Sequence, residues 1–440
     1  MKKKGIWIAI GLLVVLSLLI GSFGCAKEAP APAPAPAPKP APAPSPAPKP
    51  APAPAPAPKP APAPAPAPKE KIPPDTMVWT AYEPGSSSYS QMQGLANAIT
   101  DAFGTQVRLI PCGDAISRLL PGKLGKAELV VSASDWYFAP EGLLDFADLK
   151  WGPQPFRLIW QKKPTALVTL STTLDSGVMT PYDAKGKRVA LIAGSPALNK
   201  GIQAWLAFGN LTFDDVETVT YSGYYPHIQA LIDGEADLGF GYGTTGKYNE
   251  LAASPRGLNW VRLPHDDTAG WARLWQHAPY LQKIVATEQS QAIGATPENS
   301  FEGSTHFSPV VMTYEGQISE DMGYWLIKAI DELYPKYKDF HFELGFWKFE
   351  ECLTPQGFAP YHPGVVKYLK EKGIWNNDYQ KFQDGMLLRQ KILQQTWDKV
   401  TVEGIEKGLK SAEIRANWEK ARDEALASRQ ATHPTTWWSP

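Results

Sequence analysis

A tract of alternating alanine and proline from Ala29 to Lys69 constrains this chain more than any other part of the sequence. Proline at every second position removes backbone donors and fixes φ, so the tract can form neither a helix nor a sheet and is held near polyproline II. At about 3.1 Å per residue it reaches on the order of 120 Å. A lysine at every tenth residue keeps it solvated. We predict that residues 26–74 are a tether and that the folded part begins after it.

The residues before the tract have the three-part pattern of a secretory signal. Lys2 to Lys4 precede an apolar run from Ile6 to Ile20, which is short for a membrane-spanning helix. Cys25 follows Gly24, as at a bacterial lipoprotein cleavage site. We therefore predict a lipoprotein-type signal peptide over 1–25, lipidation at Cys25, and an extracytoplasmic protein anchored to the cell membrane. An uncleaved signal anchor is the alternative, and it places the rest of the chain in the same compartment.

Composition excludes several classes of function. The formal net charge is −1, so the chain has no electrostatic footprint for nucleic acid. Beyond Cys25 the cysteines are Cys112 and Cys352, which form either one disulfide or two buried free thiols. The histidines have no metal-ligand spacing, and we expect neither a metal site nor a cofactor. No serine-hydrolase elbow, zinc-protease motif or phosphate-binding Walker loop is present.

After the tether the pattern alternates between strand and helix, and it occurs twice. A strand at Val78–Tyr82, a serine-rich loop and a helix are followed by strands at Val107–Pro111 and Glu128–Ser132. The same order returns with strands at Arg188–Ala193, Val216–Tyr221 and Ala236–Phe240, displaced by about 109 positions. This repeat predicts an α/β protein with two similar lobes.

The predicted organisation after the tether has four parts. They are lobe 1 at 75–165, lobe 2 at 166–265, a return to lobe 1 with hinge helices at 266–375, and a C-terminal helical extension at 376–440. Apolar residues at helical spacing predict two amphipathic helices in the extension. These helices either wrap the lobes or dock a partner, and wrapping is the simpler interpretation.

The loops after the strands carry the candidate ligand-binding residues. In open α/β sheets ligands gather beyond the carboxyl ends of the strands, and helix N-termini accommodate small anions. Serine hydroxyls there either cap the helix or bind ligand oxygens. Aromatic residues in such loops supply shape and orienting hydroxyls. The candidates are Ser86, Ser87, Ser88, Tyr89, Ser134, Asp135, Trp136, Ser195, Asn199, Tyr224 and Tyr242.

Four stretches resemble the TAXI group of solute receptors for tripartite ATP-independent periplasmic (TRAP) transporters, across roughly 77–375. They are Gly85–Thr100, Ala127–Gly142, Asp183–Ser195 and Tyr361–Tyr368, the last containing His-Pro-Gly. The resemblance implies a type II periplasmic-binding-protein fold hinged around a ligand cleft, without catalysis. It also places Ser87, Ser88, Tyr89, Ser134, Asp135 and Ser195 at the family's cleft positions. Pro196 and Ala197 depart from the family's Gly-Thr, which leaves the solute open.

The resemblance further implies that the protein captures a small carboxylate-bearing solute, such as a glutamate-like amino acid or a dicarboxylate. It would deliver that solute to a TRAP-type integral membrane permease driven by an ion gradient. An ABC-transporter-type binding lipoprotein, or a sensor or adhesin on the same fold, is the alternative, and a hydrolase fits less well. For His362 we predict a structural role, in which it fastens the C-terminal helix of the lobe.

Overall fold

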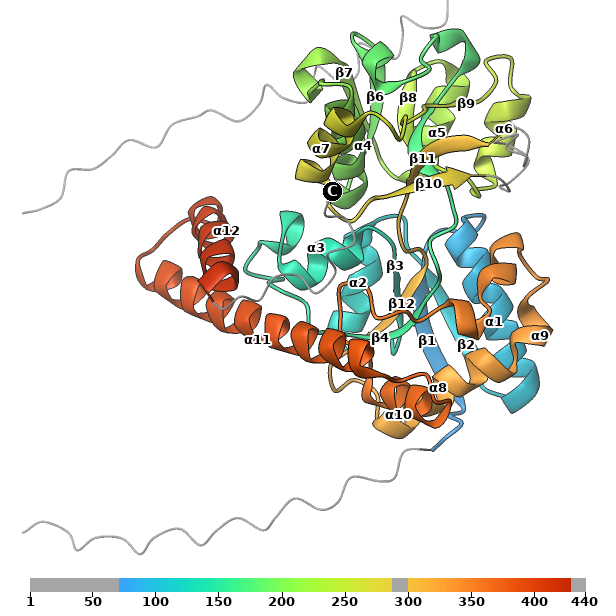
Figure 1. Cartoon of the computed structure of the whole chain (residues 1–440), viewed down its shortest axis with the longest axis vertical. Helices are drawn as coiled ribbons and strands as arrows, with labels where there is room; N and C mark the ends of the chain where they lie inside the picture. Colours follow the sequence, from blue (N-terminus) through green and yellow to red (C-terminus); the bar gives the residue numbers. More distant parts are fainter. Residues whose placement is uncertain (1–70, 287–299, 429–440) are drawn as a thin grey trace, which may run out of the picture. The chain divides into compact units, whose positions relative to one another are not determined.

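The computed structural model describes residues 71–286 and 300–428. The predicted signal peptide at 1–25, its Cys25 and most of the tether at 26–74 lie outside the described residues. Among the residues described, no helix combines the length and the apolar character needed to cross a membrane. The description below concerns the folded unit from residue 71 onward (Figure 1).

Lobe 1 is built on a sheet in the order β2-β1-β3-β12-β4 (Figure 1). β1 and β2 are parallel, a parallel bridge between Trp79 and Leu129 joins β1 to the start of β3, and β12 is antiparallel to both β3 and β4. The strands are β1 Thr76–Ala81, β2 Gln106–Pro111, β3 Val130–Ser132, β4 Phe156–Gln161 and β12 Val310–Tyr314. The helices are α1 Ser87–Phe103, α2 Ala115–Lys123, α3 Asp135–Glu141, α8 Glu320–Glu332, α9 Tyr334–Tyr337 and α10 Pro363–Glu371, with short 3₁₀ turns at η1 Leu144–Phe146, η5 Phe342–Phe346 and η6 Phe349–Glu351.

Helix α1 shows why the sequence forms a helix at this place. The Ser86 hydroxyl accepts a hydrogen bond from the Tyr89 N–H at 3.2 Å and caps the first turn. Met92, Leu95 and Ile99 recur at helical spacing and are buried against the sheet. Gly104 adopts φ 73° and ends the helix in the left-handed conformation that glycine tolerates. The cap fixes the start of α1 beside the carboxyl end of β1.

Lobe 2 is built on a sheet in the order β10-β11-β5-β8-β6-β7, with the short β9 also paired to β5. β6 runs parallel to both β7 and β8, and β5 is antiparallel to β8. The strands are β5 Val168–Thr172, β6 Arg188–Ile192, β7 Glu217–Tyr221, β8 Leu238–Tyr242, β9 Asn259–Trp260, β10 Gln282–Ala286 and β11 Phe301–Thr305. The helices are α4 Pro196–Phe208, α5 Tyr224–Asp233, α6 Lys247–Ala253 and α7 Thr268–His277, with 3₁₀ turns at η2 Leu174–Ser176, η3 Pro181–Ala184 and η4 Phe213–Asp215.

The two lobes share one plan, as the repeat predicts. The order β2-β1-β3 in lobe 1 matches β7-β6-β8 in lobe 2, and in each case an antiparallel strand follows, β12 or β5. The three predicted strands of each lobe overlap the observed ones within a few residues. The predicted class is therefore confirmed: an α/β protein with two similar lobes and C-terminal helices.

Two segments cross between the lobes. One is residues 162–167, between β4 and β5, and the other is residues 306–309, between β11 and β12. β11 pairs with β5 in the sheet of lobe 2, with Ser304 opposite Val168. The structure thus places the return to lobe 1 after residue 305, whereas the sequence placed it at 266. α7, β10 and β11 consequently belong to lobe 2.

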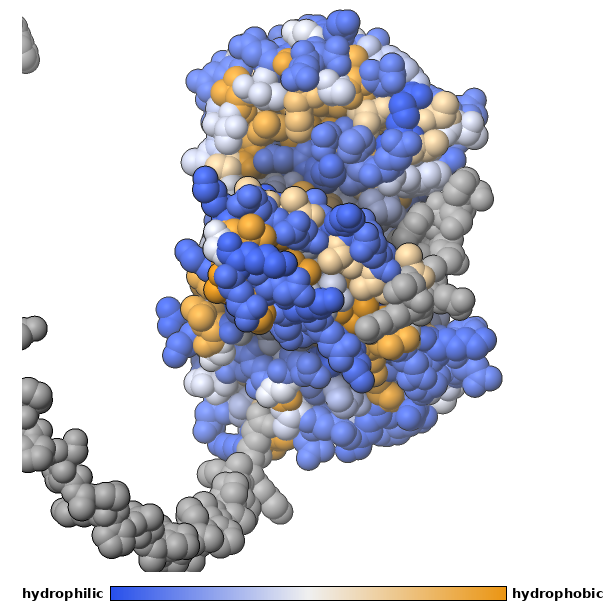
Figure 2. Space-filling model, turned by 90° about the vertical axis from the view of Figure 1, so that its left-hand side faces the viewer, coloured by the Kyte–Doolittle hydropathy of each residue, from blue (hydrophilic) through white to orange (hydrophobic). Residues whose placement is uncertain are grey.

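The C-terminal extension is a helical hairpin packed on lobe 1. Helix α11 spans Asn377–Glu406 and α12 spans Ser411–Ser428 (Figure 1). Trp397 and Trp418 meet edge to face, with ring centroids 5.1 Å apart, and the Trp418 indole N–H donates to the Gly142 carbonyl at 2.6 Å. Figure 2 looks onto this side of the molecule and shows hydrophilic surface broken by apolar patches. The hairpin therefore packs on lobe 1 through Trp418 and through the Arg389 and Arg422 contacts with Glu141.

His362 has the structural role that the sequence predicts. It caps α10, with its Nδ1 accepting from the Gly364 N–H at 3.2 Å, and its Nε2 lies 3.4 Å from the Ile318 carbonyl oxygen. The ring is 3% exposed and lies against the start of α8. It therefore fastens α10 to α8 within lobe 1.

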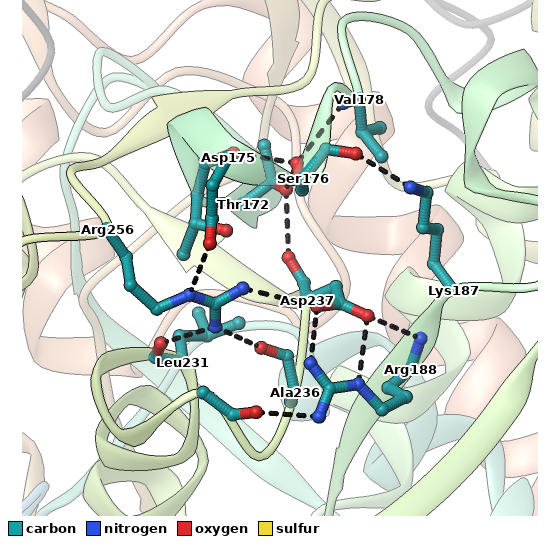
Figure 3. A network of polar contacts seen from close by, with 12 residues as sticks. Thr172, Asp175, Ser176, Val178, Lys187, Arg188, Leu231, Ala236, Asp237 and Arg256 are labelled. Atoms are coloured by element: carbon teal, nitrogen blue, oxygen red, sulfur yellow. Dashed lines mark hydrogen bonds and ion pairs between the residues drawn. The ribbon is translucent and has the colours of Figure 1, made fainter.

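A polar network fixes the far end of lobe 2 (Figure 3). The Asp237 carboxylate accepts hydrogen bonds from Arg188 Nε at 3.1 Å and from Arg256 at 3.2 Å, and Arg256 Nε also donates to Asp175 at 3.0 Å. Burial alone would raise the pKa of Asp237, but the bonds from Arg188 outweigh it and lower the pKa to about 2. Arg188 opens β6 and Asp237 precedes β8, so this network lies at the amino ends of the strands. The candidate site lies at their carboxyl ends.

Candidate functional site

A cavity lies between the lobes, where strands from both sheets end. Tyr82 follows β1, Ala133 follows β3, and Tyr242 closes β8, and all three line the cavity. His306 and Ser308 of the second crossing segment complete the wall. This is the position where open α/β sheets collect ligands.

Lobe 1 contributes the start of α1 to the cavity. Ser86, Ser87 and Ser88 all line it, and all three are buried. The first turn of a helix presents backbone N–H groups without intrahelical acceptors at the positive end of the helix dipole. Hydroxyl groups and N–H donors are thus concentrated on this side.

Lobe 2 contributes a more apolar wall. Leu198 at the start of α4 and Phe240 on β8 line the cavity, with Tyr224 and Thr245, whose hydroxyls lie 3.1 Å apart. Pro196 is the first residue of α4 and has no N–H group to offer. The equivalent helix starts therefore differ between the lobes, one being polar and the other apolar.

The cavity is small, and its described lining is electrically neutral. Its volume is about 30 Å³. A buried water needs about 10–15 Å³ on the same measure, so the cavity has room for about two waters. Of the described residues that line it, none carries a charged side chain. A solute of ordinary size can enter only if the lobes move apart.

Five of the eleven predicted ligand-binding residues line the cavity: Ser86, Ser87, Ser88, Tyr224 and Tyr242. Two others lie directly behind the wall. The Ser134 hydroxyl is 3.4 Å from His306 Nε2, and Trp136 packs edge to face on Phe307 with ring centroids 5.9 Å apart.

The remaining four predicted residues have other surroundings. Asn199 donates to the Ile192 carbonyl and accepts from the Ile192 N–H, both at 2.9 Å, so its amide holds the end of β6. Ser195 is buried and caps α4 without a side-chain hydrogen bond to it. Tyr89 is half-buried on α1 and does not line the cavity.

Asp135, the fourth, forms a buried ion pair with Arg118, and the two side chains are 2% and 1% exposed. The Arg118 guanidinium also lies over the Tyr82 ring, 3.6 Å from its centroid, and donates to the Tyr82 hydroxyl at 2.9 Å. The Arg118–Asp135 pair therefore lies behind the cavity wall and positions Tyr82, which lines the cavity. Arg118 has no signal in the sequence other than its place on a helix that follows β2.

His306 is a cavity residue that the sequence did not single out. Its Nδ1 lies 2.9 Å from the Phe307 carbonyl oxygen, so Nδ1 carries the proton and Nε2 is an acceptor. Burial lowers the pKa of His306 to about 4. The ring is consequently neutral at pH 7 and offers a hydrogen-bond acceptor beside Ser134.

Three buried histidines predict that the fold loses stability in mild acid. The pKa values of His227, His306 and His362 are each lowered to about 4, first of all by burial. Between pH 6.5 and 4 these histidines are protonated in the unfolded chain but stay neutral in the folded chain. The free energy of unfolding therefore falls as pH falls through this window. Each fully buried ring accounts for about 2 kcal/mol at pH 5.

Urea denaturation at pH 7 and pH 5 measures this effect. We expect His227→Gln to remove about 2 kcal/mol of the difference between the two pH values, because glutamine keeps a donor but does not titrate. His227 lies outside the cavity lining, and its Nε2 is 2.9 Å from the Phe240 carbonyl oxygen. If His227→Gln and the parent lost the same free energy of unfolding between pH 7 and pH 5, the lowered pKa of His227 would be contradicted.

A buried carboxylate lies behind Ser87 and Tyr242. Glu343, on η5, is fully buried and pairs with Lys162 of the first crossing segment at 2.6 Å. Burial alone would raise the pKa of Glu343, but the Lys162 ammonium outweighs it and holds the pKa below its usual range. Glu343 is therefore a carboxylate at neutral pH. Neither residue was predicted, because 181 positions separate them in the sequence.

Cys112 and Cys352 are both buried free thiols. This settles the alternative between a disulfide and two thiols that the sequence leaves open. Among residues 71–286 and 300–428, no three His, Cys, Asp or Glu side chains are grouped as metal ligands.

Comparisons with known proteins give one match to a family model. The model of the NMT1-like family matches residues 125–373. A comparison with curated protein sequences gives no match.

Similar solved structures include the alkanesulfonate-binding protein SsuA from Xanthomonas axonopodis pv. citri bound to MOPS, at 13% identity over 82% of this chain and 91% of that chain, with a TM-score of 0.36. They also include the substrate-binding protein AbpA of an amino acid ABC transporter from Streptococcus pneumoniae bound to L-arginine, at 14% identity over 70% of this chain and 95% of that chain, with a TM-score of 0.34.

Proposed function

The chain belongs to the NMT1-like family, and we propose that it is an extracytoplasmic solute receptor that binds a small carboxylate between its two lobes and releases it unchanged to a membrane permease. The observation that carries the proposal is the cavity, which is lined by both lobes at the carboxyl ends of their strands. A cavity in this position opens and closes as the lobes move about their two crossing segments.

The start of α1 supports a carboxylate as the bound group. Ser88 brings its hydroxyl, and Ser87 and Ser88 bring first-turn N–H groups, to the same wall of the cavity. A carboxylate accepts such bonds at the positive end of the helix dipole without needing a basic side chain. The neutral lining is therefore compatible with an anion held by hydrogen bonds alone.

The wall formed by lobe 2 indicates the character of the rest of the solute. Leu198 and Phe240 present apolar surface, and Tyr224 and Thr245 add hydroxyls. The solute that fits has an acid group toward α1 and a less polar body toward lobe 2. A glutamate-like amino acid or a dicarboxylate remains within the proposal if its second polar group is bound by those hydroxyls.

Delivery is the second half of the proposal. The predicted lipid at Cys25 and the predicted tether would hold the receptor near a membrane while leaving it free to reach a permease. The resemblance of four sequence stretches to TAXI receptors supports a TRAP-type permease driven by an ion gradient.

Uptake of the solute into vesicles containing the permease, with and without an ion gradient, tests the energy source. Uptake driven by ATP instead would assign the receptor to the ABC type.

A thermal-shift screen tests the ligand class. The full chain with Cys25→Ser is titrated with amino acids, dicarboxylates, keto acids and aromatic acids, each beside its amide or methyl ester. We expect stabilisation by at least one acid and not by its uncharged analogue, because binding to the folded state raises stability with ligand concentration. Stabilisation by a sugar or a metal ion, with none by any acid, would overturn the proposal.

A further inference from the structure

The Glu343 carboxylate is held by groups from both lobes. From α1 in lobe 1, Ser87 Oγ donates to it at 2.9 Å and Gln91 Nε2 donates at 3.3 Å. From lobe 2, the Tyr242 hydroxyl lies 3.4 Å from Glu343 Oε2 and shares its proton with the Ser308 carbonyl oxygen, also at 3.4 Å, and the Thr244 hydroxyl donates to Glu343 Oε1. These contacts make Glu343 a bridge across the closed cleft.

The environment of Glu343 is that of a built carboxylate site. The side chain is fully buried, its charge is balanced by Lys162, and four neutral donors surround it. Hydrogen bonds to an ionised group contribute about 1.5–3 kcal/mol each, roughly twice a neutral bond. The bonds from lobe 2 therefore contribute substantially to holding the lobes together.

Two of the donors also face the cavity. Ser87 and Tyr242 line it, and in the closed molecule both donate to Glu343. The cavity has room for only about two waters, so a solute must part the lobes to enter. Parting the lobes separates Tyr242 and Thr244 from Glu343, which stays on lobe 1 with Lys162.

We propose that Glu343 is an internal counter-ligand, a carboxylate on lobe 1 that binds Tyr242 and Thr244 of lobe 2 and keeps the cleft closed while no solute is bound. The solute then competes with closure, because only the open form admits it. The apparent dissociation constant equals the intrinsic one divided by the open fraction. The closure itself is independent of the proposed function, whereas the effect on solute affinity rests on it.

Thr244→Val is the decisive variant. It removes one lobe-2 donor to Glu343, leaves the Lys162 pair intact, and spares the cavity, whose lining does not include Thr244. Thr169→Val is the matched control, because Thr169 is a buried lobe-2 threonine that donates to the Val261 carbonyl at 2.7 Å, away from the cleft. Circular dichroism checks that both variants are folded.

Distances between spin labels measure closure in the full chain without any solute. Labels are attached at Asp101→Cys on α1 and Asn249→Cys on α6, two exposed positions on different lobes, with Cys25→Ser and the buried native thiols left in place. We expect one short distance in the parent and in Thr169→Val. In Thr244→Val we expect a longer distance to appear, with the open-to-closed ratio raised about tenfold or more.

Each outcome decides the proposal. A parent that is already open without solute would overturn it, as would a Thr244→Val distance distribution identical to that of the control. Because no solute is present, this result is separate from the ligand screen. If the Glu343 bridge and the carboxylate receptor are both correct, Thr244→Val also binds the identified acid more tightly than the parent. The gain in affinity is at most the factor by which the open fraction rises. Closure without any acid binding would leave the Glu343 bridge standing and reject the carboxylate receptor.

Discussion

Glu141→Gln is expected to lower the free energy of unfolding by about 3–5 kcal/mol, because it removes the buried carboxylate that the Arg389 and Arg422 guanidinium groups share. Glu141, at the end of α3, accepts from Arg389 at 2.6 and 2.8 Å and also binds Arg422. The side chains of Arg389 and Arg422 are 7% and 11% exposed. Urea denaturation measures the loss, and limited proteolysis should show that the α11–α12 hairpin is released first.

Glu403→Gln is the control for this prediction. Glu403 lies on α11, where it is exposed and paired with lysines at 3.6 and 4.0 Å. Exposed pairs of this kind contribute about 0–1 kcal/mol, so little change is expected. If Glu141→Gln were no more destabilising than Glu403→Gln, the buried network would not be what holds the hairpin on lobe 1.

Ser88→Val is expected to weaken binding of the solute by about 10- to 100-fold while leaving the fold intact. Ser88 lies in the first turn of α1 and lines the cavity. Valine removes a hydroxyl that the proposed carboxylate would use, and a lost hydrogen bond to a charged group costs about 1.5–3 kcal/mol. Isothermal titration with the acid identified by the screen measures the change.

Ser90→Val on the same helix provides the comparison. The Ser90 hydroxyl donates to the Ser86 carbonyl at 3.2 Å, and Ser90 does not line the cavity. Its replacement should alter stability slightly and affinity hardly at all. Equal affinities for Ser88→Val and the parent would remove the start of α1 from the binding site.

The architecture was largely predictable because the signals that specify it are local. Buried strands such as β1 and β8 are short apolar runs in the sequence. Helix α1 is indicated by a serine cap followed by apolar residues at helical spacing. The repeat then related the lobes. Strands β4, β5, β9, β10, β11 and β12 were not predicted. Of these, β10 alternates between partly exposed and exposed positions until Ala286, as expected of an edge strand, and such a pattern is weak in sequence.

The site was predictable only where its residues follow a strand or open a helix. Ser87, Ser88 and Tyr242 meet that condition and line the cavity. Glu343 lies in a 3₁₀ turn far from any predicted strand end, and it reaches the cleft only because η5 packs against α1. Nothing near Glu343 in the chain indicates that Lys162 will neutralise it. Contacts between such distant residues follow from the tertiary fold and not from local pattern.

The two crossing segments have a consequence for the order in which the molecule assembles. Lobe 2 is one continuous stretch from β5 to β11, whereas lobe 1 needs β12, which follows that stretch, to lie between β3 and β4. A chain delivered from its N-terminus can therefore complete lobe 2 first. During that interval β3 and β4 lack their shared neighbour and expose unpaired edges, which are prone to wrong pairing. Lobe 1, which contains the polar start of α1, therefore completes its folding last. Its folding depends on prompt synthesis of the segment from β12 onward.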